Sequence, residues 1–485
     1  MHKIIGTALP LSALRSGQTG LKDAPNGTVA DGLLFLDWLE RTGQSAWQLL
    51  PLSETHLEPG SKSVHVPSPY KGYGIGLDPR YLPEEMRSLE PSPDEERAFK
   101  RENAEWLPDY ALFCALRDRF GTDDWSVWPA AIRNHRPEAV NEWRRRLNGQ
   151  VTAKIREQWR LHLAFSGLKS RAQRAGIYLY GDLPFYLPFS GPLVWAHRDC
   201  FDILKTGKMS WVSGIPDGPQ SHYGRQVWGH PLYRWKGPGQ TQRILKMWRM
   251  RIAYYARFYD AMRLDHAKGF FNFGAMSAKS KKLDNIRFGP GRMALADIID
   301  YSRDRGLELF AEDSGDRLEE LRAALHEFGV PGIRILRWAY NEKKKHLERD
   351  YSDVRNYPRN CYAFSSTHDT VPLAAYLKAL TPNERAHLCI HVGVENTRSD
   401  GLLVDRLIGA LVSSSAGRVI IPLQDWLHSK DRINVPGTEK RKGDPNWRYR
   451  IGVPVERLPD IGLSPQFVKK RAMRKRTTKR NRRRK

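Results

Sequence analysis

The chain has 485 residues, of which 79 are Lys or Arg and 54 are Asp or Glu, so its formal net charge is +25. Hydrophobic residues make up 40% of the sequence, which is typical of a folded chain with a buried core rather than of a disordered one. No apolar run approaches the about 18 residues that a membrane-spanning helix needs, which excludes a membrane-spanning protein.

The first segment, KIIGTAL (3–9), is short, apolar and soon broken by a proline, so it predicts a first core strand rather than a signal peptide. The four cysteines, Cys114, Cys200, Cys361 and Cys389, lie far apart and form no C-x-x-C pair. This usage predicts reduced thiols in a cytoplasmic protein, with neither a disulfide framework nor a zinc site.

Short apolar runs rich in strand-forming residues alternate along the chain with longer amphipathic segments. The runs occupy residues 3–9, 46–52, 177–184, 260–265, 307–313, 330–336, 360–369 and 418–424. Eight strand–helix units around one core predict an α/β fold, a (β/α)8 TIM barrel.

Two long stretches interrupt this alternation. The span of about 54–170 is rich in Trp and charge with helical spacing, and predicts a helical subdomain inserted after the second strand. The span of about 185–245 is rich in Gly, Pro and Trp, and predicts a long loop at the same rim. Residues 1–468 are therefore expected to form one catalytic barrel with its insertions.

The last 17 residues, KKRAMRKRTTKRNRRRK (469–485), carry 12 Lys or Arg and no acid. Such a block repels itself and has no apolar area to bury, so it predicts a disordered tail. One interpretation is weak binding to a nucleic acid or another anionic surface, and the alternative is a solvated extension without a partner.

Acidic residues stand near the ends of four predicted strands: Asp182, Asp265, Glu312 and Asp369. The carboxyl ends of barrel strands are where active sites of this fold lie. Arg263 is two residues before Asp265, so on a strand the two side chains face the same way and the arginine is expected to hold the aspartate ionised. A single acid at a strand end can instead cap the next helix, but a ring of four is less easily explained in that way.

Several carboxylates and an arginine, without a cluster of metal ligands, suit chemistry at a glycosidic bond. One ionised carboxylate attacks the anomeric carbon, and a protonated carboxyl drives out the leaving oxygen. Because these groups supply both nucleophile and acid, neither a cofactor nor a metal is expected.

The segments MRLDHAKGF, LFAED and STHD resemble, in order and spacing, the nucleophile, acid/base and third-acid regions of the α-amylase clan. The flanks are more specifically similar to the 4-α-glucanotransferases, or amylomaltases, of glycoside hydrolase family 77. The supporting segments are GQSAWQLLPL, SPYKGYG, GIYLYGDLPFY, VWAHRDCFDI, VWGHPLYRW, GPGRMALADII, GVPGIRILRWAY, IIPLQDWL, RINVPGT and DPNWRYR.

The resemblance implies a retaining mechanism in which Asp265 is the nucleophile, Glu312 the acid and then the base, and Asp369 the stabiliser of the transition state. It further implies carboxyls of Asp265 and Glu312 roughly 5–5.5 Å apart and a raised pKa for Glu312. The substrate-binding residues implied by the resemblance are Arg263, His368, Asp182, Ser68, Tyr70, Trp228 and Asn434.

The implied activity is transfer of α-1,4-glucan segments between malto-oligosaccharides. The stretch 214–231 departs from the family's usual loop, with His230 in place of an asparagine, and Thr370 replaces the asparagine that usually follows the third acid. An α-glucan hydrolase with the same acids is one alternative, and a non-catalytic protein that binds glucan or nucleic acid is another.

Overall fold

The computed structural model describes most of the chain, and the architecture below rests on these residues. They are residues 3–17, 27–216, 225–277, 279–280, 284–315, 317–341, 346–436, 438 and 446–461. The basic segment 469–485, for which the sequence predicts a disordered tail, lies outside the described residues.

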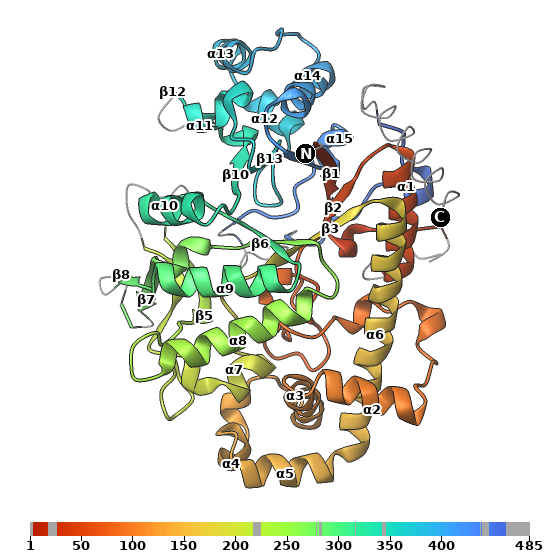
Figure 1. Ribbon diagram of the computed structural model, residues 1–485, viewed down its shortest axis with the longest axis vertical. Coiled ribbons are helices and arrows are strands. Elements are labelled where there is room, and N and C mark those ends of the chain that lie inside the picture. Colours follow the sequence, from red (N-terminus) through yellow and green to blue (C-terminus); the bar gives the residue numbers. More distant parts are fainter. Residues whose placement is uncertain are drawn as a thin grey trace.

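Eight parallel strands of the described chain form a nearly closed barrel with the strand order β10-β13-β14-β1-β2-β3-β6-β9 (Figure 1). The strands are β1 (Ile4–Ala8), β2 (Ala46–Gln48), β3 (Tyr178–Leu183), β6 (Ala261–Leu264), β9 (Glu308–Ala311), β10 (Gly332–Ile335), β13 (Cys361–Phe364) and β14 (Arg418–Pro422). Each lies within one of the eight runs predicted from the sequence, so the (β/α)8 TIM barrel is confirmed.

Helices lie between these strands along the chain. Their bounds are α1 (Val29–Arg41), α2 (Pro93–Glu102), α3 (Leu107–Phe120), α4 (Ala130–Arg133), α5 (Pro137–Arg146), α6 (Asn148–Ala175), α7 (Pro192–Ala196), α8 (Gln240–Tyr255), α9 (Arg292–Asp304), α10 (Glu319–Glu327), α11 (Arg349–Ser352), α12 (Leu373–Ala379), α13 (Pro382–Val392), α14 (Asp400–Ser413) and α15 (Leu423–Trp426). No helix among the described residues is both long and apolar enough to cross a bilayer.

Aromatic rings fill the inside of the barrel. Tyr362 stacks on Phe310 with ring centroids 3.8 Å apart, and Tyr180 meets the Tyr362 ring edge-on at 5.5 Å. These side chains alternate with outward-facing ones along their strands, so they form a layer across the barrel. The interior is thus a packed core, and polar chemistry is left to the strand ends.

The predicted helical insertion lies between β2 and β3. Helices α2 to α5 gather at the lower end of the molecule in Figure 1, and α6 runs from there along the barrel toward β3. The 28-residue α6 packs on α3 of the insertion and on α1 of the barrel, so it belongs to both. It ends at Gly176, whose φ of 68° is a left-handed conformation that glycine adopts without strain.

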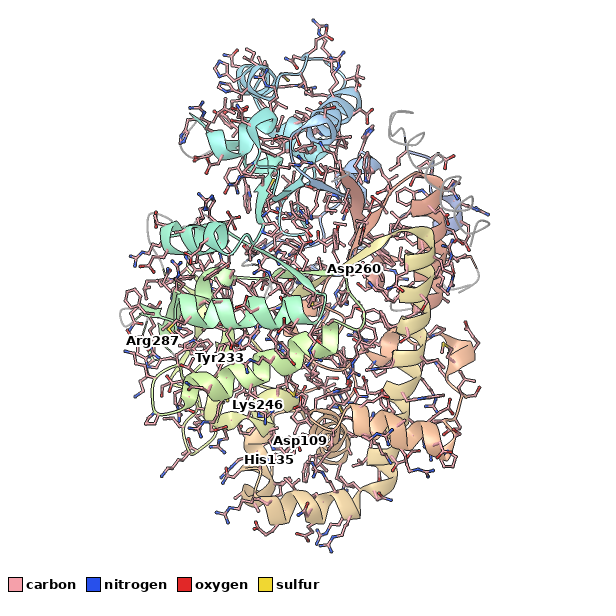
Figure 2. The ribbon with its side chains drawn as sticks, in the orientation of Figure 1. Asp109, His135, Tyr233, Lys246, Asp260 and Arg287 are labelled. Atoms are coloured by element: carbon pink, nitrogen blue, oxygen red, sulfur yellow. The ribbon has the colours of Figure 1, made fainter. Side chains whose placement is uncertain are left out.

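Asp260, labelled in Figure 2, ties the end of α6 to the barrel strands. Its Oδ2 lies 2.6 Å from Lys169 Nζ on α6 and accepts the Leu179 N–H of β3 at 2.8 Å. Since Asp260 directly precedes β6, these contacts set the register of neighbouring strands at the amino end of the barrel.

The rim stretch 185–245 is not the long loop that its composition predicts. It contains α7, two strands and the start of α8. The strands β4 (Trp211–Ile215) and β5 (Gln226–Pro231) join β7 (Asn272–Ser277) and β8 (Asn285–Phe288) in an antiparallel sheet. The prediction failed because β4 pairs with a strand that follows β6, and a local pattern does not reveal such a distant partner.

The chain after β10 holds a further short hairpin, formed by β11 (Tyr340–Asn341) and β12 (His346–Leu347). Helices α11 to α14 lie beyond it at the upper end of the molecule in Figure 1.

Candidate active site

Three neighbouring strands bring acids and an arginine together at their carboxyl ends. Asp182 on β3 is the register partner of Arg263 on β6, and β6 pairs in turn with β9. Asp265 directly follows β6 and Glu312 directly follows β9. Adjacent parallel strands thus place four polar side chains at one edge of the barrel, as the sequence predicts for this fold.

Asp369 does not lie at the end of a strand, where the sequence predicts it. The strand β13 ends at Phe364, and Asp369 lies in the loop that follows. At the start of that loop Ser365 and Ser366 both donate hydroxyl hydrogen bonds to Asp425, at 2.5 and 2.6 Å. The loop returns the Asp369 side chain to the same site.

The Arg263 guanidinium contacts three carboxylates at once. Its Nη1 lies 2.8 Å from Asp182 Oδ2 and 2.8 Å from Asp265 Oδ1, and its Nη2 lies 2.7 Å from Glu312 Oε2. The carboxylates of Asp265 and Glu312 are therefore held by two different nitrogens of one rigid, planar group.

A second set of contacts joins Asp369 to this centre. Its carboxylate accepts the Asn434 side-chain N–H at 2.6 Å and lies 3.3 Å from His368 Nε2. The Tyr70 hydroxyl lies 2.9 Å from the same His368 nitrogen and donates to Asp182 Oδ2 at 2.8 Å. Polar contacts therefore run without a break from Asn434 to Asp182.

The two remaining residues implied by the resemblance lie at the edge of this network. Ser68 directly precedes the turn that carries Tyr70, and its backbone carbonyl accepts the Lys71 N–H at 3.0 Å. Trp228 on β5 meets the His266 ring edge-on, with centroids 5.1 Å apart. The Lys71 ammonium donates to the Trp228 carbonyl and so joins the turn to the rim sheet.

Three further residues contribute to the site. The place of His266 directly after Asp265 already predicts a supporting role for it, whereas no pattern in the sequence predicts a role for Trp447 or Ser314. Trp447 lies with its ring centroid 5.5 Å from that of Tyr70. Glu312 accepts hydrogen bonds from the His266 backbone N–H at 3.0 Å and from the Ser314 hydroxyl at 3.0 Å. His266 has a φ of 48°, an uncommon conformation for a residue with a side chain, and this turn aims its N–H at Glu312.

The signals for these residues in the sequence are weak. Trp447 stands in the segment DPNWRYR, far along the chain from Tyr70, and nothing local links the two. The serine two residues after Glu312 is an ordinary turn residue by composition.

The pKa values of Asp265 and Glu312 shift in directions that the sequence does not predict. Burial raises the pKa of Asp265 well above its ordinary value despite the Arg263 contact, and the Glu312 and Asp182 carboxylates raise it further. Burial also acts to raise the pKa of Glu312, but Arg263, the His266 N–H and the Ser314 hydroxyl lower it overall. The predicted rise in the pKa of Glu312 is therefore not found in this arrangement of side chains. Arg263 acts to lower the pKa of Asp265, as predicted, but burial and the neighbouring carboxylates outweigh it.

Two other acids have opposite shifts. Burial raises the pKa of Asp182, despite the neighbouring Arg263 and His368. For Asp369 burial is outweighed by His368, Asn434 and Arg263, which lower its pKa to about 2. Asp369 is therefore ionised at any pH at which the protein is expected to work.

A cavity of about 70 Å³ lies against this network. Its polar wall includes Arg263, Glu312, His368 and Asp369, and Trp338 belongs to its apolar lining. The Asp182 side chain is fully buried, whereas that of Asp369 is 43% exposed, so Asp369 lies toward the open side. Among the described residues, no group of three or more His, Cys, Asp and Glu side chains is arranged to hold a metal ion.

A parallel barrel whose carboxyl end holds several carboxylates has the fold and site of enzymes that act on glycosidic bonds. The family model of 4-alpha-glucanotransferases, glycoside hydrolase family 77, matches residues 77–454, and the chain belongs to this family.

Comparison with individual proteins agrees with this assignment. A 4-alpha-glucanotransferase from Aquifex aeolicus is 28% identical over 90% of this chain and 92% of its own length. One from Thermus thermophilus is also 28% identical, over 88% of this chain and 91% of its own length. The solved structure of an amylomaltase from Streptococcus agalactiae, in complex with acarbose, has the same fold, with a TM-score of 0.78 at 21% identity and coverage of 93% and 95% of the two chains.

Proposed function

We propose that this protein transfers α-1,4-glucan segments between malto-oligosaccharides by a retaining double displacement. The contact of one guanidinium with both Asp265 and Glu312 carries the proposal. It supports a nucleophile and an acid/base held a short distance apart, flanking the scissile bond of one bound sugar, as the retaining mechanism requires.

In the first step, an Asp265 oxygen forms a bond to the anomeric carbon while the glycosidic C–O bond breaks. The leaving oxygen takes the proton of Glu312. In the second step Glu312 accepts the proton of an acceptor hydroxyl, whose oxygen displaces Asp265. Asp369 stabilises the positive charge that develops on the sugar, and Arg263 orients Asp265.

The first step needs Asp265 ionised and Glu312 protonated, whereas the surrounding groups raise the pKa of Asp265 and lower that of Glu312. A bound glucan supplies the change. A sugar oxygen that separates Glu312 from the Arg263 guanidinium removes the cation that lowers the pKa of Glu312. Closer contact of Arg263 with Asp265 then favours the aspartate anion.

The other predicted site residues hold the substrate. Asp182 and His368 bind hydroxyls of the sugar that is cleaved. The donor and acceptor cleft is lined by Ser68, Tyr70, Trp228 and Asn434. A cytoplasmic location fits the four cysteines, which are all buried and free.

The experiment is incubation of the purified protein with maltotriose, with products separated by chain length. We expect glucose together with a ladder of longer maltodextrins, and we expect an Asp265→Asn protein to form neither. Glucose and maltose without longer chains would contradict transfer and identify a hydrolase. Binding of maltotriose without any turnover would contradict the proposal that the protein is an enzyme.

We also propose that residues 469–485 bind polyanions weakly, because 12 of these 17 residues are cationic.

A further inference from the structure

The barrel has a seam between β9 and β10. In the described part of the chain these two strands form no ladder of backbone pairs, although every other pair of neighbours around the barrel does. The Ala311 N–H at the end of β9 donates to the Pro331 carbonyl, just before β10, at 2.8 Å. The seam thus needs further contacts at the end that carries the catalytic acids.

The Asp313 side chain supplies such contacts. Its Oδ1 accepts the Ile333 N–H of β10 at 2.8 Å, and its Oδ2 accepts from Arg334 at 3.2 Å. Arg322 on α10 lies 3.4 Å from Oδ2 and donates to the Asp313 carbonyl at 3.2 Å. The residue is only 4% exposed, so these contacts replace water.

Gly332 leaves the space that this carboxylate occupies. A Cβ atom on Gly332 would lie 2.7–2.8 Å from three atoms of the Asp313 carboxyl group. Real side-chain atoms do not approach so closely, which means that any larger residue would displace the carboxylate from β10.

Glu312 stands between the two residues that cross the seam. Its own backbone N–H donates to the Leu264 carbonyl at the end of β6, at 3.1 Å. Ala311 is held by Pro331 on one side of it, and Asp313 is held by β10 on the other. The direction of the Glu312 carboxyl therefore depends on the backbone that Asp313 fixes.

We propose that Asp313 is a positioning residue for Glu312: it closes the seam between β9 and β10 and thereby aims the acid/base at the leaving oxygen. The inference rests on the acid/base role of Glu312 in the proposed function. It concerns the proton-transfer half of the reaction, whereas the nucleophile Asp265 is anchored from β6 and does not depend on the seam.

Two glycosyl donors, maltotriose and α-maltosyl fluoride, allow the role of the acid/base to be measured separately from that of the nucleophile. Cleavage of maltotriose needs a proton from Glu312 on the departing oxygen, whereas α-maltosyl fluoride loses fluoride, which leaves with its electron pair and needs little protonation. In both cases the new bond is from Asp265 to the anomeric carbon. The ratio of kcat/KM for the two donors therefore reports the acid alone.

For Asp313→Ala we expect kcat/KM for maltotriose to fall on the order of 100-fold, since a small misplacement of a catalytic group has that effect. Fluoride release from α-maltosyl fluoride should change by less than about 5-fold, because it does not need the general acid. Asp313→Asn keeps an oxygen for the Ile333 N–H and should lie between this variant and the unchanged protein.

Gly332→Ala gives a second route to the same result, because it leaves Asp313 in the sequence but pushes its carboxylate away. It should lower the maltotriose rate selectively as well, and it serves if Asp313→Ala does not fold. Asp31→Ala is the matched control, since Asp31 is 1% exposed and accepts the Thr28 N–H at 2.6 Å on the outer helix α1. It should leave the ratio of the two donors unchanged.

Equal losses on both donors for the Asp313 and Gly332 variants would overturn the proposal, because they would show a general distortion of the barrel. Unchanged rates on maltotriose would overturn it too. Glu312→Gln is the reference for the proposed function. If Glu312→Gln lowers kcat/KM equally for maltotriose and α-maltosyl fluoride, the acid/base role of Glu312 is wrong. This outcome is independent of any result at Asp313.

Discussion

Arg263 brings one positive charge to three carboxylates, those of Asp182, Asp265 and Glu312. Three anions around one cation in a partly buried site repel each other, so their proton affinities are coupled. A small change in the position of the guanidinium therefore shifts the pKa of each of these acids.

Tyr70 links the two halves of this network through its hydroxyl. We expect Tyr70→Phe to lower kcat/KM for maltotriose by about 10-fold or more, since a hydrogen bond to a charged group contributes about 1.5–3 kcal/mol. Asp182 would lose one donor and His368 one partner, while the aromatic contact with Trp447 remains. Initial rates of glucose release from maltotriose measure the effect.

Tyr301→Phe on α9 is the control, because that hydroxyl accepts from Arg305 at 2.9 Å on the surface. Its rates should match those of the unchanged protein. If Tyr70→Phe also matches them, the continuous network is not needed for catalysis.

Among single residues, the sequence predicted the acids that follow a strand but not the side chains that reach the site from a distant turn. Asp265 and Glu312 were predictable because each directly follows a buried strand, and parallel strands end at one edge. The contact of Trp447 with Tyr70 was not, because the two residues meet only through the fold. Arg263 and, after it, the His266 N–H lower the pKa of Glu312, and the position of a backbone N–H is not encoded by the residue type.

Helix α6 holds a buried histidine in the core of the insertion. Burial lowers the pKa of His162 to about 3, far below the ordinary value of about 6.5. The unfolded chain then binds more protons than the folded one at pH values between these two. The contribution of His162 to the free energy of unfolding is therefore largest above about pH 6.5 and is lost as the pH falls toward 3.

We expect His162→Phe to remove this dependence. For the unchanged protein the linked loss between pH 7 and pH 5 is about 2 kcal/mol, and the variant should be less sensitive by that amount. Near neutral pH it should be slightly less stable, since the Tyr254 hydroxyl loses its partner at 3.2 Å. Urea unfolding at the two pH values, followed by tryptophan fluorescence, tests this.

His391→Phe is the comparison, because that side chain is exposed on α13. It should retain the full difference between pH 7 and pH 5. An unchanged difference in His162→Phe would mean that His162 is protonated in the folded protein.

At the scale of elements, buried apolar runs were enough to predict the eight barrel strands, because both faces of each strand are covered. The strands β4 and β5 were not predictable in this way. β4 joins the sheet by pairing with β7, which follows β6 in the chain, and among the described strands β5 pairs only with β4. Gly214 of β4 lies opposite Gly274 of β7, and a glycine at such a position resembles a loop residue in the sequence.

Residues 469–485 carry 12 of the 25 net positive charges of the whole molecule. Removal of these residues should leave the rates on maltotriose unchanged, because every residue assigned to the site lies before them. The same truncation should abolish binding to a labelled DNA duplex. For the full chain that binding should weaken by about 1,000-fold or more between 50 and 200 mM salt if about six or more phosphates are contacted.

Fluorescence anisotropy across this salt range measures the binding. If the truncated and full chains bind the duplex equally, the polyanion site is elsewhere on the molecule. If neither binds, the segment has no affinity for nucleic acid.

The continuity of α6 has a mechanical consequence. Its 28 residues make a rod of about 42 Å without a proline, which joins the far end of the insertion to the start of β3, the strand of Asp182. Because no proline interrupts the helix, α6 offers no evident hinge between the insertion and β3. We therefore expect that the insertion cannot be deleted without loss of stability, because the deletion would remove α6, which packs on α1 of the barrel.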